Sequence, residues 1–208
     1  MPAKPYPFFF DASTTVVTRG KLEVYNKLGK PLPLGWTLDA NGKPTTNAAE
    51  VLKNIVGKKG GGIMPLGGDI EQTGGHKGYG YGMVCEIFSS ILSMGLTSNL
   101  THIDGKGGTC YGFIAVDPKI FGESGKIEEH LLVFLQQLRD APKAEGAARI
   151  YTHGEKEMLA YADRIQNGIE VNVNTLAEMR ELATYLGMTI ETYLGNIEIA
   201  SETQSSYN

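Results

Sequence analysis

Apolar side chains recur at helical spacing along several stretches of the chain. The stretch over 79–92 is apolar on more than one side, which predicts a buried central helix. A narrower apolar stripe over 127–138 predicts a second long helix. Shorter helices are predicted over 48–55, 155–166 and 174–186.

Two of these helices begin with a capping pattern. Asn47 stands three residues before Glu50, and Thr175 stands three residues before Glu178. Each pattern predicts that the first side chain accepts a hydrogen bond from a free amide of the first helical turn. The glycine-rich residues 57–62 are expected to end the first of the two helices.

Three short stretches are typical of strands. Residues 8–10 form an apolar run that ends in a polar turn, and strands are also predicted over 21–25 and 111–116. No repeat, heptad run or low-complexity linker divides the chain. We therefore predict one layered α/β domain over residues 1–200, followed by a polar, disordered tail over 201–208.

The charges along the chain nearly cancel. There are 19 Lys and Arg side chains and 23 Asp and Glu side chains, without a basic block, which excludes the electrostatic pattern of a nucleic-acid binder. Two cysteines, Cys85 in the apolar helix and Cys110, fit reduced thiols, with Cys85 packed in the core. No signal peptide or membrane span is recognisable, so we expect a cytoplasmic protein.

A glycine-dense loop over 67–82 leads directly into the central helix. Its glycines allow a ligand to approach the backbone, and the helix start together with Lys77 favours a phosphate or pyrophosphate. The loop has neither the Walker pattern nor the Rossmann fingerprint. The alternative is that the glycines only let the helix pack tightly against a sheet, and the spacing alone does not separate the two.

Two further loops have residues suited to a nucleotide. Asp11, Ser13, Thr14 and Thr15 follow a predicted strand, where a carboxylate and hydroxyls suit a ribose, although such a turn is also typical of ordinary capping. Residues 153–156 open a helix and offer amides to an anion, although Glu155 at a plain helix start explains them equally well.

Metal and hydrolase chemistry are not indicated. The four histidines, including His102 in a glycine-rich turn and His130 on a helix, have no metal-ligand spacing, and the cysteines form no C-x-x-C pair. The nucleophile-elbow pattern G-x-S-x-G is also absent. We therefore predict no metal site.

Short motifs follow one another in a fixed order between Pro7 and Gly187. They are Asp11-Ala12-Ser13-Thr14, Arg19-Gly20-Lys21, Leu32-Pro33-Leu34-Gly35-Trp36, Met64-Pro65-Leu66-Gly67-Gly68, Gly75-His76-Lys77-Gly78-Tyr79-Gly80, and Phe113-Ile114-Ala115-Val116-Asp117-Pro118 with Gly154-Glu155 further on. In this order they resemble the malate/L-lactate dehydrogenase type 2 family, with its ureidoglycolate, sulfolactate and diketogulonate enzymes.

The resemblance implies a fold and an activity. The fold is a layered, non-Rossmann NAD(P)-binding α/β domain with a mixed β-sheet, usually in a dimer. The activity is hydride transfer between the nicotinamide of NAD or NADP and a small 2-hydroxy or 2-oxo carboxylate. The cofactor contacts that it implies are Asp11, Ala12, Ser13, Thr14, Thr15, His76, Lys77, Gly154, Glu155 and Lys156.

The resemblance also implies that part of the enzyme is supplied from elsewhere. The family has a preceding half with a proton-exchanging histidine and an arginine-bearing substrate site, so no catalytic residue is assigned in this chain. Its partner would be a second polypeptide supplying that half, or a second copy in a homodimer, and a truncated reading frame is the other alternative. The isolated chain is expected to be inactive. The alternative function is a non-catalytic nucleotide-binding or assembly module. One departure is His153-Gly154, where the family commonly has Pro-Gly.

Overall fold

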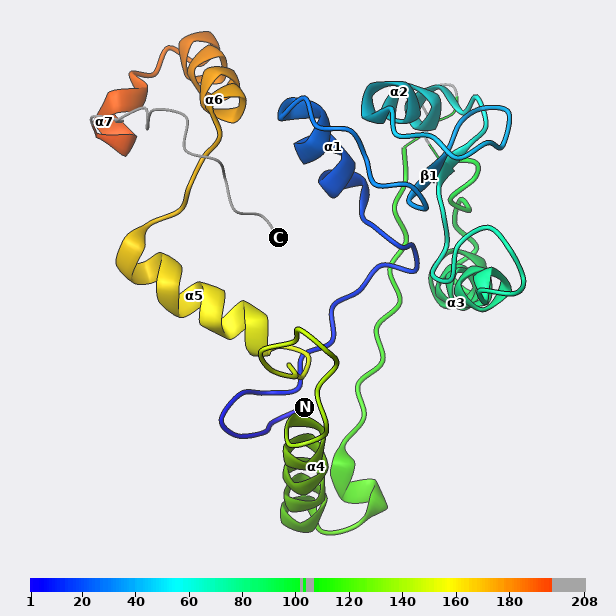
Figure 1. Ribbon diagram of the computed structural model, residues 1–208, viewed down its shortest axis with the longest axis vertical. Coiled ribbons are helices and arrows are strands. Elements are labelled where there is room, and N and C mark those ends of the chain that lie inside the picture. The colour runs from blue at the N-terminus through cyan, green and yellow to red at the C-terminus, as the bar shows by residue number, and fades with distance from the viewer. Residues whose placement is uncertain (102, 104–106, 196–208) are drawn as a thin grey trace. The chain divides into compact units, whose positions relative to one another are not determined.

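The computed structural model describes residues 1–101, 103 and 107–195 (Figure 1). Contacts divide the chain into two compact units, each built from two separate stretches. The first unit contains 1–18 and 63–168, and the second contains 19–62 and the residues from 169 onward. The single domain over 1–200 stays a prediction, and His102 and the tail over 201–208 lie outside the described residues.

The second unit is built mainly of helices. Helix α1 (Arg19–Lys27) packs against α2 (Ala48–Gly57), with Leu22 and Val51 wholly buried. As predicted, the Asn47 side chain accepts a hydrogen bond from the Glu50 amide, at 3.1 Å. The remaining helices of this unit are α6 (Val173–Tyr185) and α7 (Ile190–Leu194).

The predicted cap of the last long helix is wrong. Asn172, and not Thr175, caps α6, because the Asn172 side chain accepts a 2.9 Å hydrogen bond from the Thr175 amide. The same helix is tied to α1 by an ion pair between Lys27 and Glu178, at 2.5 Å. Glu178 is therefore used in a tertiary contact, and the capping box expected from its spacing does not form.

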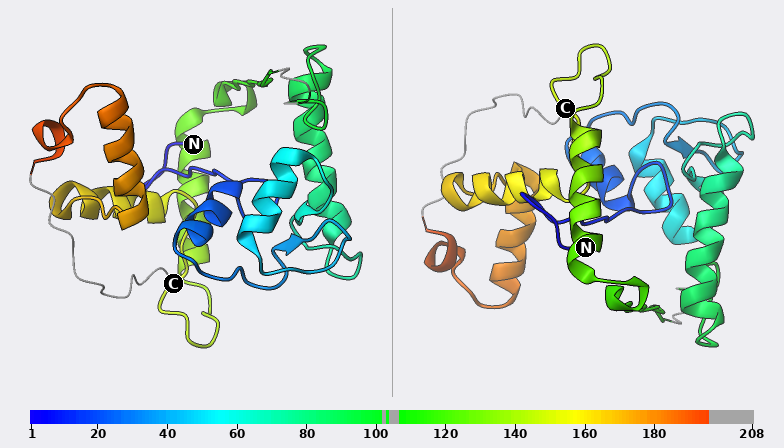
Figure 2. Two further views of the ribbon diagram at one scale, coloured as in Figure 1. Left: turned by 90° about the horizontal axis from the view of Figure 1, so that it is seen from above. Right: turned by 90° about the horizontal axis from the view of Figure 1, so that it is seen from below.

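The first unit holds the other helices (Figures 1 and 2). Helix α3 (Gly75–Glu86) continues into the π-helical turn η1 (Ile87–Ile91). The short 3-10 helix η2 (Pro118–Phe121) precedes α4 (Ser124–Arg139), and α5 (Glu155–Asn167) follows. All the helices predicted from apolar spacing are thus confirmed in kind, with small shifts at their ends.

Of the predicted layered α/β architecture with a mixed sheet, the described residues of this chain show mostly helices and one small sheet. The only sheet among the described residues has two short strands, β1 (Thr37–Leu38) and β2 (Gly62–Ile63). Residues 21–25 are part of α1, where an Arg19–Glu23 ion pair at 2.9 Å supports the helix. Residues 8–10 and 111–116 lie outside any strand, because no strand among the described residues pairs with them.

The central helix is also less buried than predicted. Gly75 and Gly78 are buried in α3, but Tyr79 and Met83 are exposed, and Cys85 is exposed instead of packed in the core. Both cysteines are free thiols, as expected. Within the described ranges, no helix has the length and apolar character needed to cross a membrane.

Candidate functional site

The first two predicted loops lie side by side in the first unit. The segment that precedes the glycine-dense loop runs antiparallel to residues 14–16. The Leu66 amide donates to the Thr14 carbonyl, and the Val16 amide donates to the Met64 carbonyl, each at 3.0 Å. These two bonds bring the hydroxyl-bearing residues next to the start of α3.

Three glycines of the second loop are required by close backbone packing. A Cβ atom on Gly78 would lie 2.1 Å from the Leu66 carbonyl oxygen, and one on Gly75 would lie 2.2 Å from the Gly68 carbonyl oxygen. A Cβ atom on Gly67 would lie 2.5 Å from the Gly74 carbonyl carbon, and Gly67 also has a positive φ of 91°. The packing explanation therefore holds for these glycines, although the partner of α3 is a loop and not a sheet.

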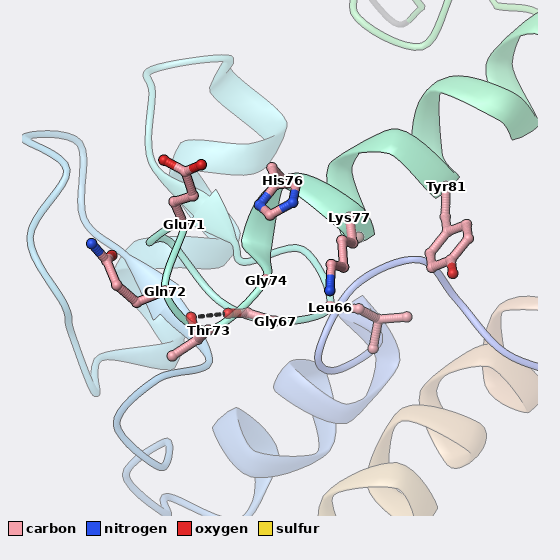
Figure 3. A pocket seen from close by; sticks show the side chains of 10 residues that line it. Leu66, Gly67, Glu71, Gln72, Thr73, Gly74, His76, Lys77 and Tyr81 are labelled. Atoms are coloured by element: carbon pink, nitrogen blue, oxygen red, sulfur yellow. Dashed lines mark hydrogen bonds between the residues drawn. The ribbon is translucent and has the colours of Figure 1, made fainter.

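A cavity of about 320 Å³ remains between this loop and the start of α3 (Figure 3). Lys77 and Tyr81, one helical turn apart, extend from the same side of α3, whereas the Glu71 carboxylate points away from the Lys77 amine. The amides of Gly75 and Lys77 already donate within the loop, to Ile70 and Gly74. The cavity therefore owes its positive charge mainly to the Lys77 side chain. Its lining residues are Leu66, Gly67, Glu71, Gln72, Thr73, Gly74, His76, Lys77, Gly78 and Tyr81.

The third predicted loop packs on the other end of the N-terminal segment. The Phe9 amide donates a 3.1 Å hydrogen bond to the His153 carbonyl, and the His153 ring meets Phe10 edge to face, with the ring centroids 5.0 Å apart. Gly154 has a positive φ of 94°, and a Cβ atom there would lie 2.7 Å from the Pro7 carbonyl oxygen. Glycine at 154 is therefore required both for its conformation and for its closeness to this segment.

Glu155 is wholly buried, and its carboxylate is engaged inside the protein. It pairs with Arg149, lies 3.5 Å from the Arg139 Nε, and accepts a 3.2 Å hydrogen bond from the Thr152 amide. Arg139 in turn donates to the Thr152 hydroxyl at 2.8 Å. These contacts fix the loop, so a cofactor contact by the Glu155 carboxylate stays a prediction that competes with three protein partners.

A second cavity, of about 390 Å³, opens beside this loop, and Lys156 and His153 line it together with Tyr151. The Tyr151 ring has the Lys156 amine 4.9 Å and the Arg149 guanidinium 4.7 Å from its centroid. Lys156 therefore brings a cation to this opening, which the Glu157 side chain also lines, whereas Arg149 is paired with Glu155.

The N-terminal segment connects the two cavities. Phe9 contacts the third loop and Thr14 contacts the second, so the two contacts are at most about 18 Å apart along the chain. Ser13 and Thr15 share a 3.0 Å hydroxyl hydrogen bond, and the Thr15 hydroxyl donates to the Val17 carbonyl at 2.8 Å. These local bonds are those of an ordinary turn. All ten residues expected at the cofactor, Asp11, Ala12, Ser13, Thr14, Thr15, His76, Lys77, Gly154, Glu155 and Lys156, belong to the first unit, and they lie on this segment or on the two loops that contact it.

The sequence did not indicate several residues of this region. Arg139 and Arg149 converge on Glu155 from separate stretches, and no spacing rule connects them. The sequence could have indicated that Tyr81 lies beside Lys77, because the two residues are four positions apart on the same helix. Across the described residues, no three His, Cys, Asp or Glu side chains gather closely enough to hold a metal ion.

Comparison with known proteins gives the family. Residues 1–180 match the malate/L-lactate dehydrogenase family, and the chain belongs to it. It is 35% identical to a malate dehydrogenase of Pyrococcus horikoshii over 189 residues, which are 90% of this chain and 51% of that protein. It is 30% identical to the L-sulfolactate dehydrogenase of Methanocaldococcus jannaschii, covering 91% of this chain and 51% of the relative.

Solved structures agree with this assignment. The malate dehydrogenase of Entamoeba histolytica superposes with a TM-score of 0.82 at 32% identity, over 91% of this chain and 54% of that chain. The fold is therefore that of the malate dehydrogenase structures, as the resemblance implied. The chain spans about half the length of the relatives that it matches.

Proposed function

We propose that this chain supplies the cofactor-binding half of an NAD(P)-dependent oxidoreductase acting on a small 2-hydroxy or 2-oxo carboxylate. The observation that carries the proposal is the alignment of two cation-bearing cavities along the segment 9–14. Membership of the malate/L-lactate dehydrogenase family supports it. The names of the relatives, malate and L-sulfolactate dehydrogenase, suggest the class of substrate.

The residues fit a dinucleotide by charge and by hydrogen bonding. Lys77 at one cavity and Lys156 at the other provide cations for phosphate oxygens. Between them, Asp11 and the hydroxyls of residues 13–15 are suited to a ribose. When bound, NAD or NADP supplies the hydride acceptor or donor. The protein's part is to hold and orient the cofactor, and the choice between NAD and NADP stays open.

The proton that accompanies hydride transfer needs another source. A general acid or base has to reach the substrate oxygen at hydrogen-bond distance. We assign no catalytic residue in this chain, because the His153 ring packs against Phe8 and Phe10 and His76 lies in the phosphate-binding loop. The proton-exchanging group is then provided by the family's other half, carried by a second polypeptide.

Nicotinamide absorbance tests this function. The chain is co-expressed with the polypeptide that carries the other half, and the purified assembly is given malate, lactate, sulfolactate or ureidoglycolate with NAD or NADP. We expect turnover with one of these acids and none with the isolated chain. An assembled complex that turns over none of them contradicts the proposal.

The second candidate function is a non-catalytic nucleotide-binding or assembly module. This function is favoured because the described residues include the predicted binding loops, and no catalytic residue is assigned among them. Cofactor binding that persists in the assembly without any turnover distinguishes the module from the enzyme.

A further inference from the structure

Lys156 is held by an aromatic ring and not by a carboxylate. Its amine lies 4.9 Å from the centroid of the Tyr151 ring, within the range of a cation–π contact. Among the residues that the structure describes, Lys156 forms no ion pair. Because the ring is uncharged, this contact orients the ammonium group without cancelling its charge. The amine therefore stays available to an anion in the cavity beside α5, which both side chains line.

The second cation near the same ring is already neutralised. The Arg149 guanidinium lies 4.7 Å from the Tyr151 ring centroid and also pairs with Glu155, whose side chain is wholly buried. A planar guanidinium stacks well on an aromatic face, so Arg149 ties the Tyr151 ring to the buried carboxylate. The ring is thereby fixed to the body of the protein, although Tyr151 is 42% exposed.

The stability of α5 does not explain a lysine at position 156. Lys156 stands in the first turn of this helix, where the helix dipole disfavours a cation. Glu157 lines the same cavity, but consecutive residues of a helix do not face each other. A free lysine side chain samples many rotamers, and ordering it on a phosphate opposes binding. Contact with the Tyr151 ring orders the side chain before an anion arrives.

We propose that Tyr151 is a positioning residue of the cofactor site, which holds the Lys156 ammonium in place for a phosphate oxygen of the dinucleotide. The inference rests on the proposed function, because that function puts a phosphate beside Lys156. Tyr151 acts through Lys156 and needs no contact of its own with the cofactor. Arg149 supports this role by fixing the ring.

The position of Lys156 can be tested without any ligand. Protons over the face of an aromatic ring resonate at higher field, so nuclear magnetic resonance of isotope-labelled lysine in the 208-residue chain detects the contact. The Lys156 ε-methylene signal is identified by its loss in Lys156→Gln. We expect it to move to lower field in Tyr151→Leu and to stay in place in Tyr151→Phe. Lys21, whose amine lies 5.9 Å from the Tyr25 ring centroid, is the internal reference and should not move.

Cofactor affinity tests the consequence of this contact. Titration of the same chain with NADH and with NADPH, followed by nuclear magnetic resonance, measures dissociation constants even where binding is weak. Tyr151→Leu is expected to raise the dissociation constant by about two- to fivefold, the usual size of an exposed cation–π contact. Tyr151→Phe should bind as the wild type does. The matched control is Tyr161→Leu, which changes an exposed tyrosine of α5 outside the cavity.

A double-mutant cycle separates positioning from a general structural effect. In a chain that already carries Lys156→Gln, Tyr151→Leu should cause no further loss of affinity, because the ring has no amine to hold. A further loss of the same size would show that Tyr151 contacts the cofactor itself or maintains the loop, and it would overturn the inference.

Two other results would also overturn it. One is a Lys156 signal that does not respond to Tyr151→Leu. The other is an affinity for NADH and NADPH that is unchanged or increased in this variant, which would mean that the ring holds the amine away from the phosphate. Absence of binding by the wild type, with a Lys156 signal that still depends on Tyr151, would instead count against the proposed function.

Discussion

The carboxylate of Glu155 accepts a 3.2 Å hydrogen bond from the amide of Thr152, three residues earlier in the chain. No part of Glu155 reaches solvent, and the Arg139 side chain beside it is only 11% exposed. The loop before α5 therefore depends on a buried charge cluster.

Glu155→Ala is expected to destabilise the protein by about 3–5 kcal/mol, because it leaves the buried charge of Arg139 without its carboxylate. Urea unfolding followed by circular dichroism measures the change. The control is Glu157→Ala on the exposed side of α5, expected to change stability by no more than about 0.5 kcal/mol. Equal effects of the two substitutions would show that the buried cluster adds nothing.

Gly78 and Gly80, two residues apart in α3, should change the stability of the protein in opposite directions when each is replaced by alanine. Nothing lies within 4 Å of a Cβ atom on Gly80, so Gly80→Ala should raise stability by about 1 kcal/mol through helix propensity. Gly78→Ala should lower it, because its methyl group would overlap the Leu66 carbonyl. Thermal unfolding of the two variants measures both signs, and stabilisation by both would contradict the packing of α3 on the loop.

Local sequence patterns were informative where a few neighbouring residues decide the structure. The helix over 48–57 and its Asn47 cap were predictable because the apolar stripe lies within the helix and the capping side chain lies directly before it. The three loops were also recognisable as segments for the same reason, whereas their cofactor contacts stay a prediction. The Asn172 cap was not predicted, because Thr175 and Glu178 have the spacing of a capping box, whereas Asn172 accepts from the Thr175 amide and Glu178 pairs with Lys27.

Features that depend on distant residues were not predictable. Strand composition identified 111–116, but a sheet needs partners, and none lies within the described chain. The apolar stripe of α3 predicts a buried helix, because large apolar residues are most often buried. In the structure, however, Tyr79 and Met83 are exposed. The arginines around Glu155 come from different stretches and have no spacing signal.

The hydrogen bonds to the Glu86 carboxylate predict a dependence of stability on pH. Hydrogen bonds from the Ser98 hydroxyl and the Ser98 amide, the latter at 2.8 Å, lower the pKa of Glu86 below its usual 4.5. A lowered pKa means that the stabilisation is present above the unfolded value and is lost as the pH falls through the folded value.

Unfolding of the wild type and of Glu86→Gln should therefore differ most near neutral pH and converge in acid. Urea midpoints measured from about pH 6 down to about pH 3 give this comparison. Glu128→Gln, at an exposed position of α4, is the control and should not alter the pH profile of the wild type. A constant difference between wild type and Glu86→Gln over the whole range would exclude the ionised carboxylate as the cause.

Cofactor binding by the isolated chain should be weak and should depend on Lys77. The cavity at the start of α3 has its positive charge mainly from this side chain, since the amides of Gly75 and Lys77 are already used within the loop. One exposed charge contact contributes only about 1 kcal/mol, or about fivefold in affinity. In the isolated chain, the nicotinamide end of the cofactor lacks the contacts that the family's other half is expected to make.

Lys77→Ala is thus expected to remove most of the remaining binding, and titration calorimetry with NADH and with NADPH measures it. Lys119→Ala is the control, because it removes an equal charge from an exposed position in the same unit, away from both cavities. A nonspecific attraction between the cofactor and a cationic surface would weaken equally in the two variants. Tight binding by the isolated chain that is insensitive to Lys77 would mean that the phosphates lie elsewhere, and that the second loop serves only to pack α3 against Leu66.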